Sequence, residues 1–424
     1  MLSIKYIREN LEKVRLSVLN KNTNVDLDEI ISIDDQRREL ARKNDEMKTQ
    51  RNQATQQISQ KKKRKENADI EIKEMRNLSQ QIKEVDSKLR DVESLLRNKL
   101  LYVPNIIHES VPLGKDESAN KLVKKWGDEK SFDFTPKDHL ELNNALNLFD
   151  FSGASKMAGS GFTLYTGLGA KLERSLINFM LDFHIDNHGY TELLPPFLAN
   201  HSATETTGQL PKFADDMYAI ETDQLFCIPT AEVPVTNMHK DDSLLEKKLP
   251  IQYVASSACF RREAGSYGKD TRGLMRLHQF NKVEMVKFVK PSESYLELEN
   301  LLSNAEAILQ ALGLSYKIVT LASGDLSFSA TKCYDIEIWA TGTQKYLEVS
   351  SCSNFESFQA RRGNIRYRRE SDNKLEFVHT LNGSGVATPR LMIALLETYQ
   401  QADGSIIIPK PLQKYMGIDR IKSK

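Results

Sequence analysis

The chain has 424 residues, 40% of them hydrophobic, which is enough for two or three domains with sizeable cores. Its 59 basic and 58 acidic side chains leave a formal net charge of +1, so any affinity for nucleic acid must come from local patches. No apolar run approaches the length that spans a bilayer, and charged residues begin at Lys5, so we expect neither a signal peptide nor a membrane location.

The cysteines are spread along the chain without the paired spacing of a metal site. They are Cys227, Cys259, Cys333 and Cys352. Widely spaced thiols of this kind are typical of proteins in a reducing compartment rather than of disulfide frameworks. We therefore expect a cytoplasmic protein with reduced cysteines and no zinc.

The N-terminal quarter has the heptad pattern of two long helices, with seam positions at alternating spacings of three and four. The first series is Ile30, Ile33, Arg37, Leu40, Asn44, Met47, Arg51, Ala54 and Ile58. The second is Met75, Leu78, Ile82, Val85, Leu89, Val92 and Leu96. The polar segment between them predicts that the helices fold back as an antiparallel coiled-coil arm over about residues 28–100.

A basic run separates the two series: Lys61, Lys62, Lys63, Arg64 and Lys65. It favours an arm whose cations follow an RNA phosphate backbone without reading its sequence. The alternatives are a coiled coil that dimerises or docks a protein, a nuclear import signal, and a merely solvated loop.

A further helix is expected before residue 188, because apolar residues form one stripe there. They are Leu172, Leu176, Phe179, Met180 and Phe183. The sequence HGYTELLPPFL follows and reads as a strand that ends in proline, with Pro196 as its second proline. We interpret the helix and the strand as a dimer element.

The most informative segment, Phe260–Glu284, predicts two antiparallel strands joined by a long turn. Side chains alternate along a strand, so Arg261 and Glu263 should share one face of the first strand. The stretch 264–274 supplies the turn through its glycines Gly265, Gly268 and Gly273. The second strand, 276–285, should carry on one face Arg276, His278, Phe280, Lys282 and Glu284.

These residue types suit a nucleoside triphosphate and an amino acid bound side by side. Arginine forks match phosphate oxygens, an aromatic ring can stack on a base, and a carboxylate can hold an ammonium group. A surface hairpin with scattered salt bridges is the alternative. Downstream, Glu348 and Ser350 should share a face of a strand with Ser351 next to them, and a carboxylate and a hydroxyl beside a triphosphate suggest Mg²⁺.

Near the C-terminus, LNGSGVATPRLMIALLETYQ predicts a glycine-rich turn that enters an amphipathic helix. Arg390 falls in the first turn of this helix, and we expect it to point toward the same site. No Walker A sequence is present, so the nucleotide site must be of another design.

Taken in order, these motifs resemble those of the bacterial type of seryl-tRNA synthetases, within the class II aminoacyl-tRNA synthetases. The three class motifs match Gly189–Leu198 with Pro196, Phe260–Glu284, and Gly383–Leu396 with Arg390. The serine-specific signature matches Thr230–Glu232, Glu284, Glu348–Ser351 and Asn382–Ser384. The resemblance covers nearly the whole chain from residue 110 onward. Gly161 and Thr388-Pro389 depart from it, since arginine and small residues are more usual there.

The resemblance implies an α+β fold with two domains. Residues 1–110 would be a tRNA-binding domain with the coiled-coil arm, and residues 111–424 a class II catalytic domain with an antiparallel β-sheet and flanking helices. It implies a homodimer that activates L-serine with ATP and Mg²⁺ and transfers the serine to the 3′ end of tRNA(Ser), and it would allow tRNA(Sec) as a second acceptor. The alternatives are a catalytically inactive, synthetase-like RNA-binding protein and a truncated relative that charges a carrier protein.

The resemblance also assigns the ATP-binding residues. They are Arg261, Arg262, Glu263, Arg276, Phe280, Glu348, Val349, Ser350, Ser351 and Arg390. The three arginines Arg261, Arg276 and Arg390 would be catalytic, the first bridging the serine carboxylate and the α-phosphate and the others holding the β- and γ-phosphates. Phe280 would carry the adenine and Glu263 would accept from its amino group, while Glu348 and Ser351 would hold Mg²⁺.

The implied serine-binding residues are Thr230, Ala231, Glu232, Arg261, Glu284 and Ser384. Glu232 and Glu284 would hold the ammonium group, and Thr230 and Ser384 would meet the side-chain hydroxyl. The basic run at 61–65 would contact tRNA. Either glutamate could instead be the ion-pair partner of an arginine, and Phe280 could belong to the core. We expect a structural role for His278, since an ionised carboxylate needs no general base.

Overall fold

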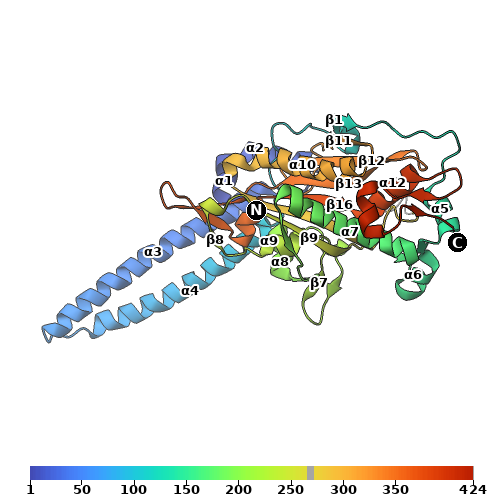
Figure 1. Ribbon diagram of the computed structural model, residues 1–424. Coiled ribbons are helices and arrows are strands. Elements are labelled where there is room, and N and C mark those ends of the chain that lie inside the picture. The colour runs from blue at the N-terminus through green and yellow to red at the C-terminus, as the bar shows by residue number, and fades with distance from the viewer. Residues whose placement is uncertain (265–271, 424) are drawn as a thin grey trace. The chain divides into compact units, whose positions relative to one another are not determined.

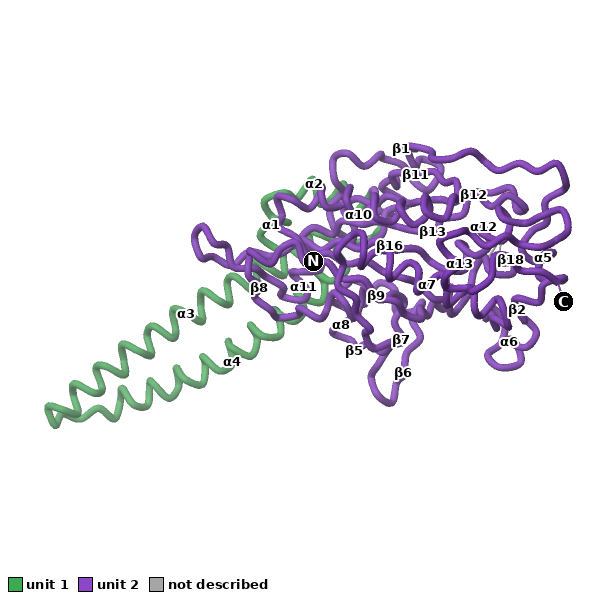
Figure 2. The backbone as a smooth tube through the Cα atoms, in the orientation of Figure 1, with its two compact units in different colours: residues 1–19, 23–104 green, residues 20–22, 105–424 purple. Residues whose placement is uncertain are grey.

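The computed structural model describes residues 1–264 and 272–423, so Gly265 and Gly268 of the expected turn lie outside the described residues. The chain divides into two compact units (Figure 2): residues 1–19 with 23–104, and residues 20–22 with 105–424. Among the described residues, no helix is both long and apolar enough to cross a membrane.

The first unit is helical, and its two long helices form the expected coiled coil (Figure 1). Its helices are α1 (Ile4–Glu9), α2 (Leu11–Asn20), α3 (Leu27–Lys63) and α4 (Asp69–Leu100). The side chain of Asp26 caps α3 by accepting from the amide of Glu29. Lys61, Lys62 and Lys63 lie in the last turn of α3, where cations stabilise the negative end of the helix dipole.

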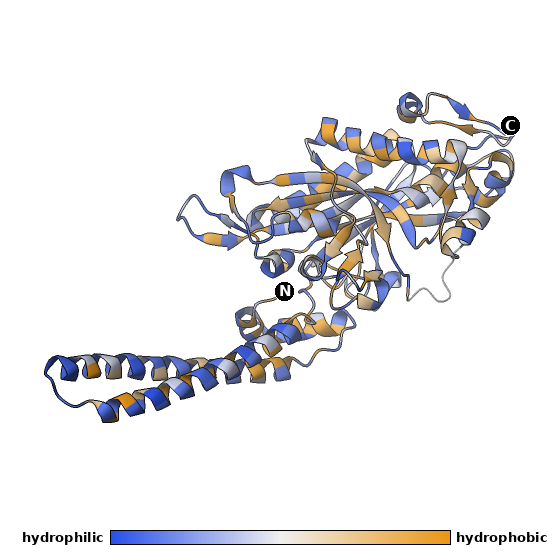
Figure 3. Ribbon diagram, turned by 90° about the horizontal axis from the view of Figure 1, so that it is seen from below, coloured by the Kyte–Doolittle hydropathy of each residue, from blue (hydrophilic) through white to orange (hydrophobic). Residues whose placement is uncertain are grey.

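The seam between α3 and α4 is apolar in its middle and polar beside it. Met47, Ile82 and Val85 form a buried cluster. Next to it the buried Asn44 donates to Asp86 at 2.6 Å. Figure 3 shows apolar residues interspersed with many hydrophilic ones along both helices. The arm is therefore a slender coiled coil whose register is marked by a polar pair.

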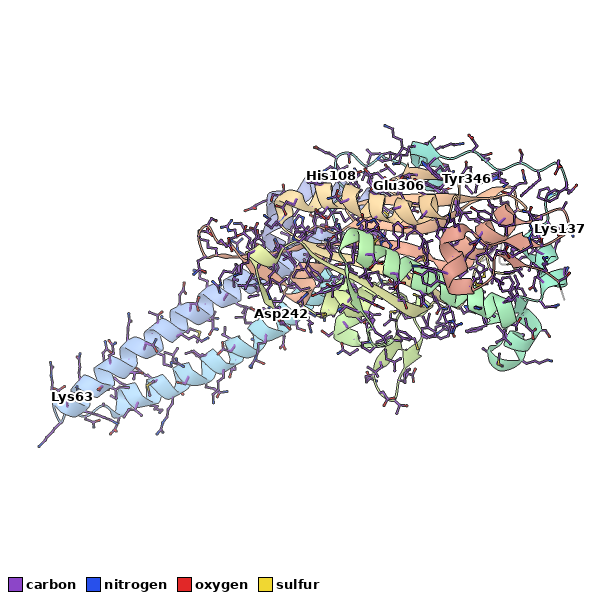
Figure 4. All side chains as sticks on the ribbon, in the orientation of Figure 1. Lys63, His108, Lys137, Asp242, Glu306 and Tyr346 are labelled. Atoms are coloured by element: carbon purple, nitrogen blue, oxygen red, sulfur yellow. The ribbon has the colours of Figure 1, made fainter. Side chains whose placement is uncertain are left out.

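The basic run differs from the expected polar tip. The helix continues through Lys63, which Figure 4 labels at the end of α3. The ammonium group of Lys61 pairs with the carboxylate of Glu71 on α4 and so contributes to the fold of the arm. The exposed cations of the run are Lys62, Lys63, Arg64 and Lys65.

The second unit is built on a central sheet that has eight strands among the described residues. Their order is β1-β11-β12-β13-β16-β10-β9-β4. Their bounds are β1 Lys121–Trp126, β11 Tyr316–Thr320, β12 Lys332–Ala340, β13 Lys345–Asn354, β16 His379–Ala387, β10 Gln279–Val289, β9 Ile251–Phe260 and β4 Thr191–Leu193. Neighbouring strands are antiparallel, except that β4 runs parallel to β9 at the edge. The expected α+β class with an antiparallel sheet is confirmed.

Helices and small sheets complete this unit. The helices are α5 His139–Leu146, α6 Phe151–Ala158, α7 Gly167–His188, α8 His201–Thr207, α9 Glu232–Asn237, α10 Ser294–Ala311, α11 Phe358–Gly363, α12 Thr388–Tyr399 and α13 Lys410–Met416. The short strands are β2 Phe149–Asp150, β3 Leu164–Tyr165, β5 Leu198–Asn200, β6 Ala219–Ile220, β7 Leu225–Cys227, β8 Ser243–Leu245, β14 Arg366–Arg368, β15 Leu375–Phe377, β17 Ile406–Ile407 and β18 Arg420–Ile421. Short 3-10 helices occupy Glu117–Ala119, Ala214–Asp216, Glu246–Lys248 and Pro291–Glu293.

The main core lies between one face of the sheet and the helices α7, α10 and α12. The stripe expected on α7 is confirmed, since Leu172, Leu176, Phe179 and Met180 are buried there. Val283 and Met285 of β10 enter this core, so their strand neighbours Lys282 and Glu284 must face the other way. Around Lys282 and Glu284 the other face of the sheet is therefore polar, whereas Val286 and Phe288 further along the same face join a second buried apolar cluster.

Two expected element types near the motifs are wrong. The glycine-rich segment at 383–387 is not a turn but the end of β16, a central strand that can carry polar groups because its neighbours also face the cavity. The helix α12 is not amphipathic, because it is buried on nearly every side beneath the sheet. Arg390 is its partly exposed exception near the first turn.

The strands of the second motif have other bounds than expected. β9 ends at Phe260 and β10 begins at Gln279, so Arg261, Glu263, Arg276 and His278 lie outside the strands. Glu263 has a left-handed backbone with φ of 54°, which breaks the alternation of a strand. Alternation alone therefore could not predict which way these side chains point.

We predict that Ile82→Ala destabilises the arm without affecting the sheet. Ile82 is 3% exposed in the seam, and truncating a buried isoleucine removes about 2–5 kcal/mol. Hydrogen exchange followed by mass spectrometry should show faster exchange in α3 and α4 only. Ile70→Ala, at a 74% exposed position of the same helix, is the matched control. Equal exchange in both variants would contradict the assignment of Ile82 to the seam.

Candidate active site

A cavity of about 510 Å³ opens on the polar face of the central sheet. Residues expected in the site that line it are Thr230, Glu232, Arg261, Glu263, Arg276, Phe280, Glu348, Val349, Ser351, Ser384 and Arg390. Residues expected in the site that do not line it are Arg262, Ala231, Glu284 and Ser350. Site residues predicted from segments far apart in the sequence therefore lie around one cavity.

Three arginines line the cavity, each with an internal acceptor. Arg261 directs Nε toward the carbonyl oxygen of Pro229 at 3.4 Å, and its guanidinium lies 5.2 Å from the ring centroid of Phe280. Nε of Arg276 is 3.1 Å from a carboxylate oxygen of Glu263. The cations are thus partly neutralised and held in position before any ligand binds.

Arg390 is anchored on two backbone carbonyl groups at once, one in the loop before β10 and one within β13. Its Nε donates to the carbonyl oxygen of Met275 at 3.2 Å, and its Nη1 donates to the carbonyl oxygen of Glu348 at 2.8 Å. Pro389 occupies the first turn of α12, where its missing N–H leaves no helical bond unmade. The departure at Pro389 therefore does not prevent Arg390 from reaching the cavity.

A β-bulge in β13 determines which side chains of this strand reach the cavity. Opposite Ile336 and Glu337 of β12, the partners are Ser350 and Glu348, so Val349 is the extra residue. The expectation that Glu348 and Ser350 share a face is wrong for this reason. Ser350 is buried and donates to the carbonyl oxygen of Ser384 at 2.6 Å.

The same bulge brings Glu348 and Ser351 together. The hydroxyl of Ser351 is 3.3 Å from Oε1 of Glu348. A carboxylate and a hydroxyl oxygen are hard ligands, and Mg²⁺ commonly uses so few protein oxygens when phosphate oxygens and water complete its shell. These residues therefore fit the expected ion. Asp335, opposite Ser351, went unnoticed in the sequence; burial, and then the charge of Glu348, raise the pKa of its carboxyl group.

Two buried glutamates are joined by one amide: Glu232, which lines the cavity, and Glu284, which does not. Nδ2 of Asn382 donates to Glu232 and to Glu284, at 2.9 Å in each case. Gln359 donates to the other carboxylate oxygen of Glu232 at 2.6 Å. Burial, and then repulsion by Glu284, raise the pKa of Glu232 to about 7. Two like charges so close favour a cation between them.

Lys282 is the internal cation of this cluster. Its ammonium group pairs with Glu284 and donates to the hydroxyl of Thr230 at 3.0 Å. The ion pair suspected for Glu284 thus exists, but with a lysine of the same strand rather than an arginine. Asn382 and Lys282 had sequence signals, in the serine signature and on the charged face, whereas Gln359 had none.

His278 and Phe280 each have a structural part. Nδ1 of His278 lies 3.1 Å from the carbonyl oxygen of Arg261, and its amide donates to Gly161 at 2.8 Å. At Gly161, where φ is 79°, a Cβ would lie 2.5 Å from the His278 ring, so the arginine usual in the family could not fit without moving it. Phe280 lines the cavity and also packs against the main core.

A buried carboxyl group behind the cavity joins α7, β10 and α12. Glu173 of α7 accepts from Nδ2 of Asn281 at 2.9 Å and from the hydroxyl of Thr388 at 2.5 Å. That hydroxyl also lies 2.9 Å from the carbonyl oxygen of Asn281. The one proton of this hydroxyl is thus shared between a carboxyl oxygen and a carbonyl oxygen, and burial raises the pKa of Glu173 to about 7. Thr388, a departure from the family pattern, is therefore part of a local network.

Two family models match this chain. The tRNA synthetase class II core domain (G, H, P, S and T) matches residues 217–399, and the seryl-tRNA synthetase N-terminal domain matches residues 1–107. The antiparallel sheet, the three arginines and the core-domain match define a class II aminoacyl-tRNA synthetase.

Similarity over the full length narrows the class to one family. Serine–tRNA ligases from Chloroherpeton thalassium and Syntrophobacter fumaroxidans are 54% and 52% identical to the chain, over 99% of it and 100% of each relative. The crystal structure of seryl-tRNA synthetase from Pyrococcus horikoshii complexed with ATP has a TM-score of 0.93 at 36% identity, with 100% of both chains covered. The chain belongs to the seryl-tRNA synthetase family.

A cytoplasmic serine–tRNA ligase from Naegleria fowleri in complex with AMP is a more distant structural neighbour, with a TM-score of 0.88 at 27% identity over 100% of this chain and 99% of that one. The resemblance inferred from the sequence motifs is confirmed, and with it the assignment to the ATP-dependent ligases of class II.

We predict that Glu173→Gln changes the pH dependence of stability. A carboxyl group whose pKa rises from 4.5 to about 7 on folding stabilises the fold below pH 4.5, and this contribution is lost as the pH rises through 7. The neutral amide escapes this loss, so thermal unfolding from pH 5 to pH 8 should increasingly favour the variant, by up to about 3 kcal/mol.

The matched control is Glu306→Gln, a buried glutamate on α10 outside the cavity, labelled in Figure 4. The same pH trend in both variants would contradict a protonated Glu173.

Proposed function

We propose that the cavity activates L-serine with ATP to form seryl-adenylate, and that the chain then transfers the serine to the 3′ end of tRNA(Ser). The observation that carries this proposal is the pair of buried carboxyl groups joined by Asn382, of which Glu232 lines the cavity together with Asn382 and three arginines. An ammonium group and a triphosphate are the ligands that such a pairing recognises. A catalytically inactive RNA-binding protein would have no use for this arrangement.

Activation requires an oxygen of the serine carboxylate to bond to the α-phosphorus while the bond to the pyrophosphate oxygen breaks. The attacking carboxylate is already ionised, so no proton needs to be removed by the protein. Catalysis then consists of positioning and charge stabilisation. Arg261 would bridge the carboxylate and the α-phosphate, and Arg276 and Arg390 would hold the β- and γ-phosphates.

The nucleotide would sit over Phe280, next to the arginines. Arg261 lies 5.2 Å from this ring, so adenine could stack there only beside or in place of the guanidinium. Glu263, which holds Arg276, would accept from the adenine amino group. Arg262, Val349 and Ser350 would support the ATP site from its edge. Glu348 and Ser351 would hold Mg²⁺, which when bound would neutralise phosphate charge.

The amino acid would bind beside Lys282. The ammonium group of the bound serine would lie between Glu232 and Glu284 and would favour the charged form of both carboxyl groups. The hydroxyl groups of Thr230 and Ser384 would pair with the seryl hydroxyl, with Ala231 buried behind them. Alanine would leave these polar groups unpaired, which a hydrogen-bonding site penalises strongly.

The first unit would recognise the RNA. We assign residues 1–110 to a tRNA-binding domain and 111–424 to the catalytic domain. The exposed cations at 62–65 would contact tRNA phosphates, whereas Lys61 is committed to Glu71. Shape recognition of this kind would also admit tRNA(Sec).

The assembly would be a cytoplasmic homodimer. Large apolar side chains follow the edge strand β4, with Leu194 82% exposed and Phe197 38% exposed. Neighbouring apolar side chains at an edge strand favour burial against a second copy. They support the sequence-based interpretation of this segment as a dimer element.

The proposal predicts ATP–pyrophosphate exchange that serine stimulates, without tRNA, and that the other standard amino acids do not. Glu284→Gln should abolish serine-dependent exchange, because the ammonium group loses a charged partner, while ATP binding measured by calorimetry persists. No exchange with any amino acid, from folded protein, would favour the inactive RNA-binding alternative. Equal loss of ATP binding would make Glu284 a structural residue.

Deleting residues 35–95 should impair the transfer of serine to tRNA without impairing the activation of serine. The cavity residues all lie beyond residue 200, so serine-dependent exchange should persist. Attachment of serine to tRNA(Ser) should fall by at least about tenfold, since several phosphate contacts are lost. Full charging by the shortened chain would contradict the RNA-binding role of the arm.

A further inference from the structure

One wall of the cavity is an irregular segment, residues 327–331, that precedes β12. Ser327 and Ser329 of this segment line the cavity. The segment has no place in the sheet, so its conformation must be fixed by other contacts.

Each carbonyl oxygen of these five consecutive residues accepts from a residue far earlier in the chain. Nζ of Lys21 donates to the carbonyl oxygens of residues 327, 328 and 330, at 2.9, 3.3 and 2.5 Å. Asn105 donates through its backbone N–H to the carbonyl oxygen of residue 328 at 3.0 Å, and through its side-chain Nδ2 to the carbonyl oxygen of residue 329 at 2.8 Å. The amide of His108 donates to residue 331 at 3.1 Å.

Lys21 is an unusual choice for this position. It is 7% exposed, and burial lowers its pKa to about 7. Its three contacts match the three N–H bonds of an ammonium group, whereas a neutral amine has only two. Within residues 1–264 and 272–423 no carboxylate pairs with Lys21, so the carbonyl dipoles must offset the cost of burying its charge.

The segment held in this way packs near Glu232, at the part of the cavity proposed to bind serine, which we call the serine end. Gly208, at φ of 92°, lies so close that a Cβ there would be 3.2 Å from Cβ of Ser329. The preceding carbonyl, of Thr207, accepts from Nε2 of Gln359 at 3.3 Å, and the same Nε2 donates to Glu232 at 2.6 Å. A short series of contacts therefore leads from Lys21 to a proposed ammonium-binding carboxylate.

We propose that Lys21 and Asn105 are positioning residues for the serine end of the cavity, acting through the segment 327–331. This inference rests on the proposed function. Residues 20–22 and residue 105 are also the points at which the chain passes between its two compact units. Both passages are thus fastened to the same wall of the cavity.

The test compares Lys21→Met and Asn105→Ala with the wild-type enzyme in ATP–pyrophosphate exchange. Each variant should raise the KM for serine about tenfold, since hydrogen bonds to a charged group or to buried carbonyl oxygens are lost, and should leave the KM for ATP within about twofold. Calorimetric titration with serine should give the same change in Kd. The 35–95 deletion keeps both anchors and should leave the KM for serine unchanged.

The matched control is Lys287→Met, which removes another buried lysine, paired with Glu297 and outside the cavity lining. It should lower the Tm and leave both KM values unchanged. An unchanged KM for serine in Lys21→Met, or parallel increases for serine and ATP, would overturn the inference. If Lys21→Met does not fold, Asn105→Ala and Lys21→Arg decide by the same criteria. Absence of serine-dependent exchange in the wild type would instead contradict the proposed function, and this inference with it.

Discussion

The pairing of β10 between β9 and β16 is the constraint on which the cavity depends. Its alternation sends Val283 and Met285 into the helical layer, so the intervening charged residues have to meet on the opposite face. Charges buried at the centre of a sheet are costly unless they are paired there. Lys282 pairs with Glu284 on β10 itself, and Asn382 of β16 donates a further hydrogen bond to Glu284. The core and the cavity are two consequences of one register.

The free protein already provides a charged partner for three of the groups that would bind a ligand. Arg276 has Glu263, Arg390 has Glu348, and Glu284 has Lys282. These pairs hold the side chains close to the places where phosphate or ammonium would lie, which reduces the ordering needed on binding. A ligand must then share or displace internal partners, and a ligand that offers only one of the two charges would leave part of the network unpaired.

Long periodic patterns and family motifs were predictable from the sequence, but local geometry was not. The heptads of α3 and α4 and the stripe of α7 repeat often enough to specify helices. The bulge at Val349 depends on the partner strand, so alternation alone misplaced Ser350. The left-handed backbone at Glu263 likewise has no signal in strand periodicity. Gln359 and Lys21 act through contacts with residues far away in the sequence, which no spacing rule reveals.

The fastening of residues 20–22 to the second unit bears on how the chain can be recombined. A catalytic fragment that begins at residue 105 would contain the second unit except for residues 20–22, and so would lack Lys21, a side chain that belongs physically to that unit. A chimera that exchanged the N-terminal part for that of another protein would import a foreign residue at this position. Modular shuffling of such chains is therefore restricted to grafts that carry the lysine or an equivalent donor with them.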